Sequence, residues 1–182
     1  MPAHALRPVA SLSLAALMIL SPVTAARASE TIKDAGTAVT AALPLIAGGI
    51  SLLNGDEEGA VQLVKSVVVS SGLAFGLSRA FKSRNPDGTV NDTFPSNHAT
   101  VAFGAASYMD HRYGWKYGLP GYLAAGFVGY SRIEADKHNL VDIVGAAVLS
   151  WGVSHLFVTP LPVDAGAEVT PDRALLRISA RW

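Results

Sequence analysis

His138 and Asp142 have the residue types and the spacing of a nucleophile with an orienting acid. They are four residues apart, so on a helix they share one face, and the carboxylate can accept a hydrogen bond from one imidazole nitrogen. That bond fixes the tautomer and leaves the other nitrogen as a nucleophile. An ordinary polar pair at a helix start is the alternative. However, Asp142 lies in the apolar run 140–144, where an unpaired acid is costly, and this favours the pairing with His138.

Ser131 and Arg132 precede this pair along the chain. A guanidinium can bind two phosphoryl oxygens through its planar fork of N–H groups. The Ser131 hydroxyl can cap a helix or donate to the same oxygens. The alternative for Arg132 is a solvated charge in a loop.

The segment Pro95-Ser96-Asn97-His98 has the pattern of a helix start, with Ser96 as the N-cap. The free backbone N–H groups of such a start, around Ser96 and Asn97, form an anion site. His98 in the first turn is then placed to protonate a leaving oxygen. The alternative is a capped turn with a surface histidine.

Together these segments resemble the type 2 phosphatidic acid phosphatase superfamily. That superfamily includes membrane lipid phosphatases, soluble bacterial class A acid phosphatases and vanadium haloperoxidases. Residues 95–98 are similar to its second motif, with Asn97 where glycine is commonest, and residues 131–142 to its third. The likeness covers roughly residues 58–158.

The resemblance implies a role for each residue of the two motifs. His138 would attack phosphorus to give a phosphohistidine, His98 would be the general acid and Asp142 would orient the nucleophile. Arg132 and the helix-start backbone would stabilise the transferring group. No metal and no cofactor are implied.

The first motif of the superfamily is altered in this chain. The superfamily has a lysine, six residues and then Arg-Pro; here Pro86 matches the proline, but Asn85 and Ser78 stand at the arginine and lysine positions. Three displaced basic residues are candidates to bind the phosphate instead: Arg79, Lys82 and Arg84. The alternative is that they are ordinary basic residues at a helix end.

Composition limits the class of protein. Half of the 182 residues are apolar, 15% are charged and the formal net charge is zero, so no basic surface indicates nucleic acid. The absence of cysteine excludes disulfides, thiolate catalysis and cysteine-ligated metals. A mean hydropathy of +0.33 is toward the membrane side of the globular range.

The first 28 residues resemble an export signal. An apolar stretch follows Arg7, Pro22 is expected to end its helix, and Ala26-Arg27-Ala28 is a small-x-small cleavage site before Ser29. An uncleaved first membrane helix is the alternative. Residues 29–160 are then the helical phosphatase domain and 161–182 a tail.

The elements that must position these residues are apolar helices that alternate in direction. We expect them at Ala35–Leu53, Glu58–Ala80, Pro95–Tyr108, Tyr117–Tyr130 and His138–Val158. The candidate residues then gather at one end of the bundle, while His111 and Arg112 form a surface pair at the other. The fold class is therefore an all-α bundle of five to six helices of the kind the resemblance implies, embedded in a membrane, with an irregular tail or one strand over 173–182.

The function expected is a metal-independent phosphatase, with a phosphorylated lipid or a small phosphate ester as substrate. Its site would face the periplasm from a bacterial inner membrane. A soluble periplasmic acid phosphatase of broad specificity, a haloperoxidase, and a weakened relative that only binds phospholipid remain open. The leaving group, the oligomeric state and any protein partner are not defined by the sequence.

Overall fold

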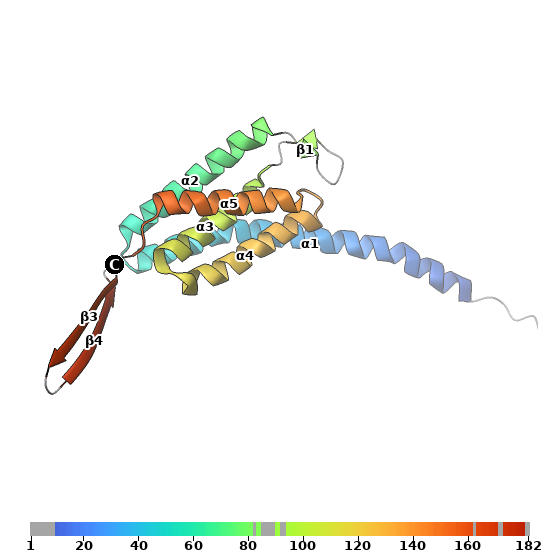
Figure 1. The fold of residues 1–182 in the computed structure, drawn as a ribbon. Coiled ribbons are helices and arrows are strands. Elements are labelled where there is room, and N and C mark those ends of the chain that lie inside the picture. Colours follow the sequence, from blue (N-terminus) through green and yellow to red (C-terminus); the bar gives the residue numbers. More distant parts are fainter. Residues whose placement is uncertain are drawn as a thin grey trace, which may run out of the picture.

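A computed structural model describes the backbone of residues 10–81, 83–84, 90–91, 94–161, 163–170 and 173–180, and the side chains of residues 29–81 and 94–161. Within this part the chain has five helices: α1 Ala10–Leu53, α2 Glu57–Ala80, α3 Asn97–Tyr113, α4 Trp115–Glu134 and α5 Leu140–Phe157. The helices pack as a bundle (Figure 1), which confirms the all-α fold.

Helix α3 is the centre of the bundle and contacts α1, α2, α4 and α5. Most of its buried residues are small, among them Ala99, Ala102, Gly104, Ala105 and Ala106. Small side chains let the surrounding helices approach closely. Because the other four helices surround α3, its histidines, aspartate and arginine lie within the bundle and not on its apolar outer surface.

The outer helices expose large apolar side chains, for example Leu45 on α1, Val64 on α2, Phe127 on α4 and Val148 on α5. Among the described residues, three segments are long and apolar enough to cross a membrane: Ser29–Leu53, Glu57–Ala80 and Leu140–Phe157. This pattern, with polar groups inside and apolar groups outside, is typical of a bundle that lies in lipid.

Several predicted boundaries are wrong because the helices run further than expected. The helix end predicted at Pro22 is absent, since α1 is continuous from Ala10 to Leu53; a proline removes one backbone hydrogen bond without forcing the chain to end its helix. The connection left between the predicted helices, from Tyr108 to Tyr117, is reduced to Gly114, whose φ of +85° separates α3 from α4. The loop predicted from Ser131 is also shorter, because α4 continues to Glu134.

The tail is a hairpin, so the prediction of a single strand is wrong. Strand β3, Val163–Thr170, pairs antiparallel with β4, Arg173–Ala180, with Val163 opposite Ala180. The sequence carries the signal for β3, because apolar Val163, Ala165, Ala167 and Val169 alternate with more polar residues. A second small pair, β1 Ser83–Arg84 and β2 Val90–Asn91, lies between α2 and α3.

A buried ion pair ties together the bundle end that does not carry the motifs. The Arg112 side chain, expected at the surface, is only 5% exposed and its Nη2 lies 2.6 Å from Oδ1 of Asp56. The Tyr113 hydroxyl donates to the other Asp56 oxygen at 2.7 Å. These bonds hold the pKa of Asp56 down at about 2, so the carboxylate is charged and fixes the α1–α2 turn to the end of α3.

Candidate active site

The starts of α3 and α5 are joined by a backbone hydrogen bond, from Ser96 N–H to the Asp142 carbonyl at 3.2 Å. Further along the same two helices, the Ser150 hydroxyl of α5 donates to the Thr100 carbonyl of α3 at 2.9 Å. The end of α2 is close by, since the Phe81 ring meets Phe94 edge to face. The structure therefore brings the second and third sequence motifs to one end of the bundle, as the alternation of the helices predicts.

His138 lies just before α5 rather than on it. Asn139 is the N-cap, and the helix begins at Leu140. Nδ1 of His138 lies 3.6 Å from Oδ2 of Asp142, and the two side chains are 15% and 4% exposed. Oδ2 also accepts a hydrogen bond from Asn139 N–H at 2.8 Å, so the position of the carboxylate is fixed by the helix start.

A tight turn after α4 connects Arg132 to His138. Asp136 adopts φ of +53°, and the N–H of Lys137 donates to the Arg132 carbonyl at 3.0 Å. The chain thus reverses direction over a few residues. The end of α4 and the start of α5 therefore lie at the same end of the bundle.

The Arg132 side chain is buried, with 5% of its surface exposed. Its Nε donates to the Ser131 hydroxyl at 3.2 Å, and that hydroxyl donates in turn to the Val128 carbonyl at 2.7 Å. Its Nη2 donates to the Thr37 hydroxyl at 3.1 Å and to the Lys33 carbonyl. Burial lowers the pKa of Arg132, but a guanidinium stays charged at neutral pH.

His98 is the second residue of α3 and is half-buried. Burial lowers its pKa most, and the positive charges of Arg132 and His138 lower it further. The start of α3 that carries His98 is bonded to α5 through Ser96 and Asp142, and Lys137, next to His138, is bonded to Arg132. The lowered pKa favours the neutral form of His98.

Ser96 occupies the N-cap of α3, as predicted, but its hydroxyl makes no capping bond. The Ser96 Oγ is buried and, within the described part of the chain, has no hydrogen-bond partner. Asn97, the first residue of the helix, is exposed. An unsatisfied buried hydroxyl beside free helix N–H groups is chemically suited to an anion.

The residues around the altered first motif are only partly described. Arg79 is exposed in the last turn of α2, with its guanidinium 4.4 Å from the centre of the Phe75 ring. Ser78 is buried and donates to the Phe75 carbonyl at 2.9 Å. The side chains of Lys82 and Arg84 lie outside the described residues.

Sequence reasoning missed the contribution of α1. Lys33, Gly36 and Thr37 contact Ser131 or Arg132, yet no motif marks them. The only sequence signal is a glycine within an otherwise helical segment, which is compatible with a close helix approach.

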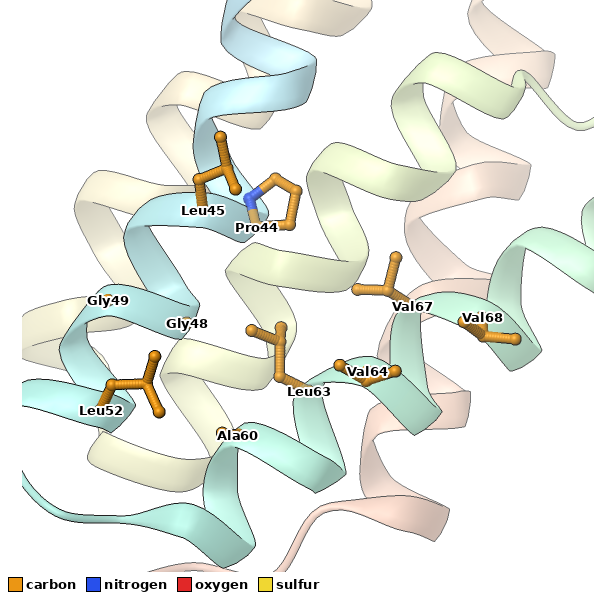
Figure 2. Close-up of a pocket in the computed structure, with 10 residues that line it drawn as sticks. All are labelled: Pro44, Leu45, Gly48, Gly49, Leu52, Ala60, Leu63, Val64, Val67 and Val68. Carbon is orange, nitrogen blue, oxygen red and sulfur yellow. The ribbon is translucent and has the colours of Figure 1, made fainter.

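The hollow in Figure 2 is a different feature from the motif cluster. It has a volume of about 530 Å³ and is lined by α1 and α2 residues such as Pro44, Leu52, Leu63 and Val67. The lining side chains drawn there are apolar. This hollow therefore offers no group for phosphoryl chemistry.

Comparison with known proteins gives the same assignment as the motifs. Residues 76–162 match the family model of the PAP2 superfamily. The chain is 32% identical over 128 residues to the lipid A 4'-phosphatase of Helicobacter pylori, which covers 64% of this chain and 65% of that protein. It is 38% identical over 73 residues to the lipid A 1-phosphatase of Porphyromonas gingivalis, covering 38% of this chain and 16% of that protein.

The fold has a solved counterpart. The crystal structure of Aquifex aeolicus LpxE superposes with a TM-score of 0.52 over 66% of this chain and 83% of that chain, at 18% identity. The chain spans less than two thirds of the length of either curated relative. The match to the PAP2 superfamily model includes α3, α4, α5 and the segments 95–98 and 131–142.

Proposed function

We propose that this chain is a membrane phosphatase that hydrolyses a phosphomonoester or pyrophosphate of a lipid through a phosphohistidine intermediate. The observation that carries the proposal is the placement of the segments with His98, Arg132, His138 and Asp142 at one end of a bundle that has three candidate membrane spans. A nucleophile, an acid and a phosphate-binding cation are then close to a lipid surface.

His138 is the nucleophile in this mechanism. The Asp142 carboxylate lies toward Nδ1, which leaves Nε2 to attack phosphorus in line. The N–P bond forms as the bond from phosphorus to the leaving oxygen breaks. Arg132 and the N–H groups at the start of α3 stabilise the charge on the phosphoryl oxygens.

His98 supplies and then recovers the proton. A bound phosphate brings negative charge that opposes the charge of Arg132, so it favours protonation of His98. His98 donates that proton to the leaving oxygen. In the second half it takes a proton from water, which attacks phosphorus while the N–P bond breaks and releases inorganic phosphate.

The substrate we propose is a lipid with a phosphate head, and a lipid A phosphate is the first to test because both curated relatives carry that name. We place the site at the periplasmic face of a bacterial inner membrane. The support for this is the export-type leader, which puts Ser29 and the nearby motif end outside.

The test is phosphate release by detergent-purified protein from lipid A, phosphatidate and a soluble phosphomonoester, with and without chelator. We expect activity on a lipid that survives the chelator and is lost in His138→Ala. His155→Gln is the matched control, since His155 is an exposed histidine on the same helix as Asp142 and stacks on Trp151. Full activity of His138→Ala would contradict the mechanism, and binding without turnover would indicate a binding protein.

A further inference from the structure

The guanidinium of Arg132 makes a specific contact between the family-matched region and the rest of the chain. The PAP2 match begins at residue 76, within α2, so α1 lies outside it. Nevertheless, two acceptors of Arg132, the Lys33 carbonyl and the Thr37 hydroxyl, belong to α1. One turn of a helix outside the matched region therefore contacts a residue of the phosphate site.

The approach of α1 to α4 is closest at Gly36. A Cβ at this position would lie 1.9 Å from Oγ of Ser131 and 3.1 Å from Nη2 of Arg132. The Ser29 hydroxyl also donates to the Glu134 carbonyl at 3.1 Å. Segment 29–37 of α1 thus packs along the last turn of α4 with no room for a larger residue at position 36.

Two of the three guanidinium nitrogens of Arg132, Nε and Nη2, donate hydrogen bonds within the protein. Nε is used by Ser131, and both N–H groups of Nη2 have acceptors on α1. Among the described residues, Nη1 has no hydrogen bond. A guanidinium has five donors in one rigid plane, so fixing two nitrogens fixes the direction of the third.

We propose that Thr37, with the Lys33 carbonyl and Gly36, is a positioning element of the phosphate site: α1 holds Nη2 of Arg132 so that Nη1 is presented to the transferring phosphoryl group. Thr37 does not touch the substrate; it acts through Arg132. The proposal rests on the proposed function, because it needs Arg132 to bind phosphate.

The test is the Thr37→Val variant, with Thr37→Ser as the conservative variant and Thr40→Val as the matched control. Thr40 is on the same helix and donates its hydroxyl to the Gly36 carbonyl at 2.8 Å, but it makes no bond to Arg132 among the described contacts. We expect Thr37→Val to lower kcat/KM on lipid phosphate about ten-fold, since a hydrogen bond to a charged group is lost. Thr37→Ser and Thr40→Val should stay near the wild-type value.

A double-mutant cycle separates positioning from a general structural effect. In an Arg132→Lys background the Thr37 hydroxyl has no guanidinium to hold, so Thr37→Val should change kcat/KM by less than about two-fold. An equal effect in both backgrounds, or an equal effect of Thr40→Val, would overturn the proposal.

Orthovanadate binding provides a readout that does not need turnover. The wild type and Thr37→Val are compared by calorimetry in detergent, and the variant should bind vanadate about ten-fold more weakly. If the wild type binds vanadate but releases no phosphate, the proposed function fails while the positioning role is still measured. Equal vanadate affinity of the two proteins would refute the positioning role even if the enzyme is active, and a wild type that neither binds vanadate nor turns over would refute both.

Discussion

The backbone N–H of Ser96 donates to the backbone carbonyl of Asp142 at 3.2 Å. The bond joins the N-cap of α3 to the first turn of α5, so the helix start that carries His98 and the turn that carries His138 form one rigid platform. Because the bond is between backbone groups, a substitution other than proline in either motif leaves its donor and its acceptor in place. Variants of the site should therefore report on chemistry more than on the position of the two helices.

Asp142→Asn should separate the catalytic role of Asp142 from its structural one. The amide oxygen can still accept from Asn139 N–H, but it no longer carries the charge that stabilises His138. We expect kcat to fall by about 10²–10⁴-fold, with a melting temperature close to that of the wild type. Asp142→Ala loses both roles and should also melt earlier, and an unchanged kcat in Asp142→Asn would contradict the orienting role.

The lowered pKa of His98 predicts a loss of stability on acidification. The folded state favours neutral His98, so the unfolded state binds a proton first as the pH falls below about 6.5. The stabilising contribution is present above that pH and is lost as the pH falls toward the folded-state pKa. We expect the wild type to melt earlier at pH 5.5 than at pH 7.5, and His98→Gln to reduce the difference. Part of the difference should remain, because burial also lowers the pKa of His111.

Asp56→Asn should affect stability without affecting catalysis. It removes one partner of a buried ion pair and leaves the Arg112 charge, 5% exposed, without its carboxylate. The expected loss is about 3–5 kcal/mol in the free energy of unfolding, measured by denaturation in detergent. The exposed neighbour Glu57→Gln is the control and should change stability little. A large loss of kcat in folded Asp56→Asn protein would show that the two bundle ends are coupled.

Gly36→Ala and Gly49→Ala should have opposite consequences although both glycines are in α1. A Cβ at position 36 overlaps the Ser131 hydroxyl, so α1 must move away from α4. A Cβ at position 49 meets nothing within 4 Å. We expect Gly36→Ala to lower both the melting temperature and kcat/KM, and Gly49→Ala to be neutral or stabilising by up to about 1 kcal/mol. Equal melting temperatures for the two variants would contradict the close approach of α1 and α4.

The proposed orientation in the membrane can be tested with single cysteines, since the natural chain has none. Glu134→Cys lies at the motif end and Lys116→Cys at the start of α4, and both positions are exposed. A maleimide that does not cross membranes should label Glu134→Cys in spheroplasts and label Lys116→Cys only after the cells are opened. The reverse pattern would place the site in the cytoplasm.

The sequence by itself determined that the chain forms a helical bundle, and it predicted the candidate site residues. The presence of each helix can be predicted from long apolar runs that are separated by turn residues, as at Asp56 and Gly114. These signals are local in the sequence. The roles of His138, Asp142 and Arg132 were predicted from residue type and from the resemblance of their motif. Their common location follows from helices that alternate in direction.

Only the tertiary structure decided how Arg132 is held, where Arg112 lies and what pairs with the last strand. The contact of Thr37 with Arg132 joins residues that are 95 apart in sequence, and Asp56 and Arg112 are 56 apart. Neither pair is marked by a local pattern, because an apolar helix that contains a threonine or a charge has the same sequence signature whatever that residue contacts. The bonds form where the packing of α1 and α3 brings the groups together, and a polar group buried by packing must find a partner that packing also supplies.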